Sequence, residues 1–141
     1  MGNAEILWNF TPRMSSQMPD KENTRVLNEQ RGRRAENIAA MFLRLKGYTI
    51  LDRRYRTSFG EIDIIARRGK IIVFVEVKAR RDHENARASL TNHQMKRIIA
   101  AAKNWFAQEN FHLDTPCRFD MITVSHYLMP RHYPNVFEDT H

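Results

Sequence analysis

Two acidic residues and a lysine in the middle of the chain have the types and the spacing that metal-assisted hydrolysis requires. Twelve residues separate Asp63 from Glu76, and Lys78 follows two positions later. Mg²⁺ takes one or two protein carboxylates as ligands, together with water and phosphate oxygens. Such a cation lowers the pKa of a bound water and stabilises charge on phosphorus, and a nearby lysine can orient or deprotonate the water. These residues therefore point to metal-dependent phosphodiester hydrolysis.

The element that must position these residues is a β-hairpin. Residues 61–66 and 71–78 have the apolar, alternating pattern of strands, and residues 67–70 form a tight turn between them. Side chains on a strand alternate between its two faces, so Glu76 and Lys78 share one face and the opposite face is wholly aliphatic. The aliphatic pattern favours registers that gather the acids on one side.

Two pairing registers of the hairpin fit this pattern. One places Asp63 opposite Phe74 and Glu61 opposite Glu76, whereas the other places Asp63 directly opposite Glu76. Opposed carboxylates repel each other, so Lys78 and a divalent cation, Mg²⁺ or Mn²⁺, are expected to compensate them. The competing interpretation is a solvated face with an ordinary salt bridge between Glu76 and Lys78.

A further carboxylate lies on the first expected helix, from about residue 27 to residue 46. At about 100° per residue, Glu36 falls at or near the apolar stripe of this helix rather than on its solvent side. There it would act as an additional acid beside the metal, or it would simply pair with Arg33 or Lys46.

The order of elements predicts an α/β fold. After the first helix and a strand over residues 48–56 comes the hairpin, then a helix from Thr91 or Asn92 to about Gln108 and a strand over residues 117–124. This order, α-β-β-β-α-β, predicts a four-stranded mixed sheet with helices packed over it. Residues 1–26 are interpreted as a loosely ordered extension, residues 27–125 as one domain, and residues 126–141 as an irregular tail with prolines.

The composition narrows the classes of partner. The 141 residues carry a net charge of +7, and residues 31–103 alone hold 18 Lys and Arg against 7 Asp and Glu. Such a segment attracts a polyanion by releasing its counterions. No apolar run approaches the roughly 20 residues that span a bilayer. The single cysteine, Cys117, fits a reducing compartment, so we expect a cytoplasmic protein without a membrane partner.

Basic side chains of this segment suit phosphate contacts, and duplex or branched DNA is the favoured partner because no aromatic-rich platform for stacking single strands is evident. These candidates are Arg31, Arg33, Arg34, Arg53, Arg54, Arg56, Arg80 and Lys96. Other chemistry is poorly supported, since the six histidines lack zinc-ligand spacing and no Gly-rich phosphate loop occurs.

The motifs resemble two related families. Asp63 with Glu76-Val77-Lys78 resembles the signature of the restriction-endonuclease-like PD-(D/E)xK nucleases. More specifically, the segments GEIDII at 60–65, VFVEVKAR at 73–80 and RFD at 118–120 resemble the small bacterial YraN family (UPF0102), which is related to archaeal Holliday junction resolvases.

The resemblance implies a restriction-endonuclease-like fold in which Asp63 and Glu76 bind Mg²⁺ or Mn²⁺ and Lys78 is catalytic. Glu36 matches a helical acid of the family, and Gln94 matches a polar position that the resolvases place near the site. The sequence departs from the superfamily at Ile62, where a proline is usual, and at Asn92-His93, where a basic pair is usual.

The resulting hypothesis is a metal-dependent, structure-selective DNA endonuclease. The alternatives are a non-catalytic nucleic-acid-binding or repair-scaffold protein with a vestigial site, and a structural domain that binds an acidic protein. Junction resolution needs two active sites, which favours a homodimer, although no dimer interface is readable in the sequence.

Overall fold

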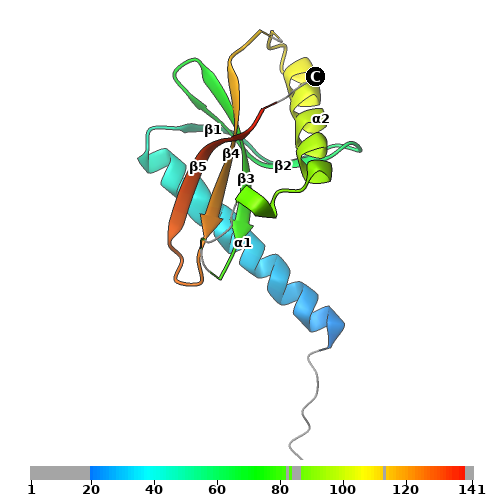
Figure 1. Ribbon diagram of the computed structural model, residues 1–141, viewed down its shortest axis with the longest axis vertical. Helices are drawn as coiled ribbons and strands as arrows, with labels where there is room; N and C mark the ends of the chain where they lie inside the picture. The colour runs from blue at the N-terminus through cyan, green and yellow to red at the C-terminus, as the bar shows by residue number, and fades with distance from the viewer. Residues whose placement is uncertain (1–19, 82, 84–86, 113, 139–141) are drawn as a thin grey trace, which may run out of the picture.

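The computed structural model describes residues 20–81, 83, 87–112 and 114–138, which form a five-stranded sheet with a helix on each face (Figure 1). The elements are α1 (Lys21–Leu45), β1 (Thr49–Arg56), β2 (Glu61–Arg68), β3 (Ile71–Ala79), the 3₁₀ turn η2 (Arg87–Ser89), α2 (Asn92–Gln108), β4 (Cys117–Val124) and β5 (Pro130–Phe137). The expected α/β order is confirmed, with one strand added at its end.

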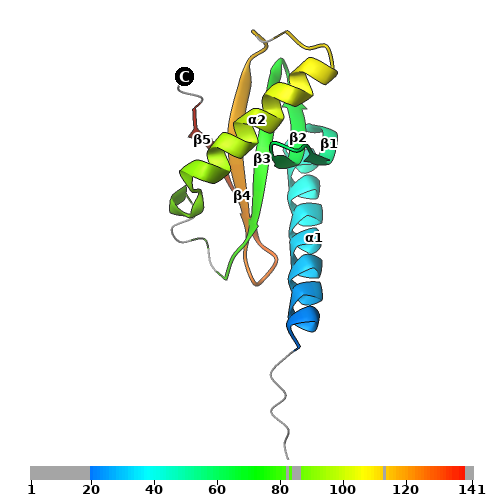
Figure 2. The ribbon, with the colours of Figure 1, turned by 90° about the vertical axis from the view of Figure 1, so that its right-hand side faces the viewer.

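The sheet is mixed, and its strands lie in chain order from β1 to β5. Strands β3 and β4 run parallel, whereas the other neighbouring pairs are antiparallel. A parallel pair needs a crossover connection, and α2 supplies it across one face of the sheet. Figure 2 shows α1 and α2 on either side of the central strands.

Both faces of the central strands are buried, which explains the continuous apolar run of β3. Ile72 and Phe74 join the core beneath α2, and Val73 and Val75 join the core beneath α1. Phe74 contacts the rings of Trp105, Phe106 and Phe119, at centroid distances of 6.0, 5.4 and 5.5 Å. Burial of the apolar area of such a core provides most of the driving force for folding.

Helix α1 begins at Lys21, with the Asp20 side chain accepting a hydrogen bond from the Glu22 N–H at 3.4 Å. The expected start near residue 27 was too late because residues 21–30 are all exposed and so show no apolar stripe. Of the extension expected over residues 1–26, residues 1–19 lie outside the described part of the chain. In the described residues, no helix has the length and apolarity needed to cross a membrane.

The four-stranded sheet was a wrong prediction, and so was an irregular tail over residues 130–137, because β5 pairs with β4 along the edge of the sheet. Residues 139–141 of the expected tail lie outside the described part of the chain. Two prolines, Pro130 and Pro134, concealed this strand. Proline lacks an N–H donor, but an edge strand tolerates it because one side of that strand has no partner. The pairing is also irregular between Phe119 and Met121.

A close backbone approach joins the β1–β2 turn to α2. A Cβ atom added to Gly60 would lie 2.2 Å from the carbonyl oxygen of Arg97, so no other residue fits there without a backbone shift. Gly32, within α1, has nothing within 4 Å of the same imagined atom. The turn that precedes β2 is therefore fixed against α2 by the absence of a side chain.

Substitution by alanine is predicted to change the free energy of unfolding in opposite directions at these two glycines. Gly60→Ala should lower the free energy of unfolding by about 1–3 kcal/mol, because the added methyl group overpacks the contact with Arg97. Gly32→Ala should raise it by about 0.5–1 kcal/mol, because alanine favours a helix interior. Urea denaturation of both variants measures the effects, and a stable Gly60→Ala protein would contradict the close approach.

Candidate active site

The candidate site lies where the β2–β3 hairpin stops being apolar. The ladder pairs Ile65 with Phe74 and Ile64 with Val75, so the hairpin has the register that places Asp63 opposite Glu76. At this point the pairing ends, and the Val77 N–H donates to Asp63 Oδ2 at 2.8 Å. The two carboxyl groups are therefore brought together, as one of the two open registers predicts.

Strand β2 changes its alternation at the same place. Ile64 packs in the core beneath α1, whereas Ile62 packs with Ile65 in the core beneath α2. Strict alternation would have put Ile62 and Ile64 on the same face. The strand thus turns around Asp63, and this turn lets both isoleucines remain buried while the carboxylate meets β3.

Lys78 lies beside the acid pair. Its Nζ atom is 3.6 Å from Glu76 Oε1, and the Lys78 and Glu76 side chains are only 15% and 18% exposed. The expected grouping of Asp63, Glu76 and Lys78 therefore occurs in the fold. The salt bridge between Glu76 and Lys78 is partly desolvated, unlike the solvated pair of the competing interpretation.

The electrostatics of the pair favour an added positive charge. Burial raises the pKa of Asp63 to about 8, and the neighbouring Glu76 carboxylate adds to this, while the Val77 N–H opposes it. Burial likewise raises the pKa of Glu76, although Lys78 opposes this shift. Within the described residues, no lysine or arginine forms an ion pair with Asp63. The pair is thus an incompletely compensated, oxygen-only donor set.

These donors fit a hard divalent cation. Magnesium commonly takes one or two carboxylates and fills its remaining positions with water and phosphate oxygens. In the described part of the chain, no group of three or more His, Cys, Asp or Glu side chains is arranged to hold a metal. Asp63 and Glu76 would therefore hold the ion with solvent or substrate oxygens as the other ligands.

Glu36 approaches the site from α1. Its charge contributes to the raised pKa of Asp63, after burial and Glu76, and its Oε2 atom lies 2.5 Å from Arg54 Nε. Its position near the apolar stripe is confirmed, since its side chain is only 17% exposed. The partner is Arg54 of β1, whose backbone is left-handed at φ 52°, rather than Arg33 or Lys46.

Gln94 has a structural role that the resemblance did not indicate. The Gln94 side chain accepts from the Thr91 N–H, and the Thr91 hydroxyl accepts from the Gln94 N–H, both at 3.1 Å. This capping box begins α2 at the predicted place. No interaction among the described residues joins Gln94 to the acid pair.

The predicted phosphate contacts do not form one surface. Arg33, Arg54 and Arg56 line a groove of about 330 Å³ together with Glu36, so this groove adjoins the acid site. Arg31 and Arg34 line a different pocket, and Lys96 lies with Lys103 at a third, between α2 and β5. Arg80 is exposed after the end of β3, and Arg53 donates to Asn37 of α1 at 2.7 Å.

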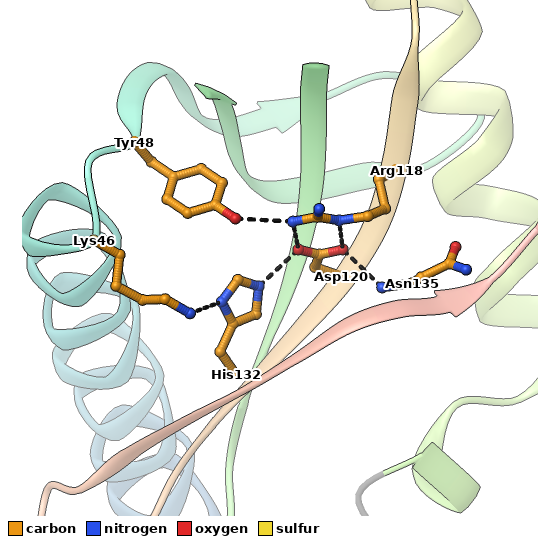
Figure 3. Close-up of polar contacts among 6 residues, drawn as sticks. All are labelled: Lys46, Tyr48, Arg118, Asp120, His132 and Asn135. Carbon is orange, nitrogen blue, oxygen red and sulfur yellow. Dashed lines mark hydrogen bonds and ion pairs between the residues drawn. The ribbon is translucent and has the colours of Figure 1, made fainter. Parts of the chain in front are cut away.

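A second buried carboxylate, Asp120 of β4, has the opposite environment (Figure 3). Arg118 donates to both of its oxygens, at 2.7 and 2.8 Å, and His132 Nε2 lies 2.6 Å from one of them. The Asn135 N–H adds a bond at 2.9 Å. Burial acts to raise the pKa of Asp120, but these bonds outweigh burial and lower it.

This network extends to the end of α1. Arg118 also donates to the Tyr48 hydroxyl at 2.8 Å, and Lys46 Nζ lies 2.6 Å from His132 Nδ1. Arg118 and Asp120 are thus the first and last residues of the RFD segment at 118–120, and they pair with each other. The part of His132 was missed because β5 was not recognised as a strand. Its pairing with Ile122 could have been found only from that strand's register.

The fold and the site together define a small α/β protein whose mixed sheet carries a buried acid pair and a lysine at the end of one hairpin. A family model described as "Uncharacterised protein family UPF0102" matches residues 35–124, which include all of these residues. The chain belongs to the UPF0102 family.

Several relatives cover most of the chain. A "UPF0102 protein" of Rhodopseudomonas palustris (strain BisB5) is 47% identical over 114 residues, covering 81% of this chain and 87% of the relative. A relative from Mesorhizobium japonicum is 48% identical over 108 residues, covering 77% and 86%. One from Brucella canis is 46% identical over 111 residues, covering 79% and 88%.

The raised pKa of Asp63 predicts a pH-dependent stability. Folded Asp63 keeps its proton up to about pH 8, whereas the unfolded chain releases it near the ordinary aspartate value of 3.8. Folding is therefore penalised increasingly as the pH rises from about 4 to about 8. With EDTA present, Asp63→Asn should be more stable than the parent at pH 8 by at least about 1 kcal/mol, and about equally stable near pH 4.

Thermal unfolding across this pH range measures the difference. Glu61→Gln is the matched control, because it removes an exposed carboxylate from the same strand and should shift little at either pH. If Asp63→Asn unfolded in parallel with the parent protein at every pH, the acid pair would not be the desolvated site described.

For Asp120, whose charge is compensated by Arg118, we expect the asparagine substitution to destabilise the protein rather than stabilise it. Asp120→Asn should lower the free energy of unfolding by about 3–5 kcal/mol, because it leaves Arg118 without its anion inside the fold. Asp114→Asn, at an exposed position, should change it by less than about 0.5 kcal/mol. Urea titration of both variants tests this, and an equally stable Asp120→Asn protein would contradict a structural role for the network.

Proposed function

We propose that this protein is a metal-dependent, structure-selective DNA endonuclease of the restriction-endonuclease-like, resolvase-related type. The observation that carries the proposal is the acid pair. Asp63 and Glu76 are desolvated side by side, Asp63 lacks a cationic partner among the described residues, and Lys78 adjoins Glu76. Keeping such a pair lowers stability, which is common where a site serves chemistry rather than packing.

The cofactor of the proposed reaction is Mg²⁺ or Mn²⁺, held by Asp63 and Glu76. When bound, the ion supplies Lewis-acid stabilisation of charge on the phosphate and acidifies water. The Val77 N–H donates to Asp63 Oδ2, so the Asp63 carboxyl group would be oriented before the ion binds. A bound cation would supply the positive charge that the raised pKa values of Asp63 and Glu76 otherwise favour as a proton.

Lys78 and Glu36 act beside the pair. The Lys78 ammonium, held near Glu76, faces the negative charge that develops as the phosphodiester bond breaks. Glu36 is neutralised by Arg54, so this ion pair limits the repulsion that Glu36 exerts on Asp63. Each side chain thus has a separate part: binding the ion, stabilising charge, or balancing the site.

The substrate of the proposed reaction is duplex or branched DNA. The groove lined by Arg33, Arg54 and Arg56 adjoins Glu36. Arg54 pairs with Glu36 and Arg56 with exposed Glu61, whereas Arg33 forms no ion pair among the described residues and would contact a backbone phosphate. The excess of basic residues over residues 31–103 supports the same class of ligand. A homodimer would provide the paired sites that cleavage of a four-way junction needs.

Cleavage of labelled duplex, flapped and four-way-junction DNA with Mg²⁺ or Mn²⁺ tests the proposal. Asp63→Asn and Lys78→Met should each reduce the rate at least about 100-fold, as loss of one preorganised charge does at comparable sites. Glu61→Gln is the control and should retain activity, because Glu61 is exposed.

Metal binding is measured separately by calorimetric titration with Mn²⁺, which Asp63→Asn should abolish. A protein that binds DNA but cleaves none of these substrates, and whose binding ignores both metal and Glu76→Ala, would overturn the proposal. That result would favour the non-catalytic nucleic-acid-binding alternative.

A further inference from the structure

The turn between β4 and β5 presents large apolar side chains to solvent. Tyr127 is 84% exposed, and Leu128 and Met129 are 48% and 62% exposed. Exposed apolar patches in small proteins often mark binding sites, and the side chains around a patch indicate which ligand it binds.

This turn is well ordered by its own backbone. The Ser125 N–H donates to the Met129 carbonyl at 3.0 Å, and the Leu128 N–H donates to the Ser125 carbonyl at 2.9 Å. Leu128 occupies the left-handed region at φ 59°, where glycine would be free of strain. The backbone hydrogen bonds and the left-handed Leu128 therefore fix the path of this turn beside Tyr127.

A basic pocket of about 200 Å³ lies between this turn and α1. Its lining includes Arg31, Arg34 and His126, together with the apolar Ala79 and Val124. Among the described residues that line it, none is acidic. Among the described residues, neither Arg31 nor Arg34 forms an ion pair with a carboxylate. Both guanidinium groups are therefore available to bind an external anion.

The pocket is at the same end of the sheet as the candidate active site. Ala79 and Val124 pair with each other at the ends of β3 and β4, one residue beyond the pair of Lys78 and Thr123. They belong to the core beneath α1, whereas Phe74, which shares its strand face with Lys78, belongs to the core beneath α2. Exposed Arg80 follows directly. A polyanion passing Lys78 can therefore continue around the strand ends into the pocket.

We infer that this turn and pocket form a second nucleic-acid contact, in which Arg31, Arg34 and His126 bind a backbone phosphate and Tyr127 stacks on an unpaired base. Uncompensated cations favour nucleic acid over an apolar protein segment as the occupant. An exposed ring beside a phosphate site is the arrangement that binds unstacked bases. The inference takes its ligand class from the proposed function, and it adds a reason for preferring branched over fully paired DNA.

Fluorescence anisotropy with a labelled fork and the matching duplex tests the phosphate contact, with EDTA present so that no cleavage intervenes. Arg31→Gln/Arg34→Gln should weaken binding of both DNAs about tenfold and reduce the salt slope by about 2, as expected for two lost phosphate contacts. Arg44→Gln/Arg67→Gln is the control, because it removes the same charge from exposed positions near the opposite end of the sheet.

The stacking contact is tested in the same titrations. Tyr127→Ala should lower fork affinity about fivefold or more, leave duplex affinity within about twofold, and so remove the preference for the fork. Tyr127→Phe keeps the ring and should behave as the parent protein. Since Tyr127 is almost fully exposed, neither variant should lower the thermal midpoint.

The outcomes separate this inference from the proposed nuclease. If these effects appear but no substrate is cleaved, the second contact stands and the endonuclease proposal fails. If Asp63-dependent cleavage is found while the pocket and Tyr127 variants bind like their controls, the second contact is overturned alone. If the parent protein binds neither DNA, or Tyr127→Ala weakens binding of both equally, the inference also fails.

Discussion

The desolvation of two carboxylates at the end of the β2–β3 hairpin is the constraint on which the arrangement of this molecule depends. Strand β3 is fully buried from Ile72 to Val75, and the next residues on its two faces are Glu76 and Val77. A slip of one residue in the pairing would move every side chain to the opposite face and bring Glu76 into the aliphatic core beneath α1. The turn at Gly69, where φ is 60°, thus sets the pairing register that places Asp63 opposite Glu76 at the other end of the hairpin.

Two buried acids, one on β2 and one on β4, illustrate how differently one residue type can be used. Asp120 receives bonds from Arg118, His132 and the Asn135 N–H, so its charge is stabilised and the network joins β4, β5 and the end of α1. Asp63 receives a single backbone N–H, and a second carboxylate stands beside it. The first arrangement stabilises the fold. The second leaves two buried carboxyl groups at one end of the sheet without enough positive charge to compensate them.

The elements with a strong local pattern could be predicted from the sequence, and the remainder depended on contacts that no local pattern encodes. The hairpin, the capped start of α2 and the strand at Cys117–Val124 were predicted because alternation, helical periodicity and a threonine cap are local. Two pairing registers of the hairpin remained possible, with Asp63 opposite either Phe74 or Glu76, because both satisfy the alternation of apolar side chains. Strand β5 was missed because its prolines contradict a strand pattern unless its edge position is known, and the partner of Glu36 comes from β1, eighteen residues away.

Both outer strands of the sheet are interrupted. On β1 the pairing shifts between Ile50 and Asp52, and Arg54 leaves the extended conformation. On β5 the prolines and the left-handed Asn135 leave few regularly spaced N–H groups along the border. Such borders resist docking of another strand, which protects against runaway polymerisation through main-chain bonds. We therefore expect self-association of this molecule to use its helices or its turns rather than an extension of the sheet from one copy into the next.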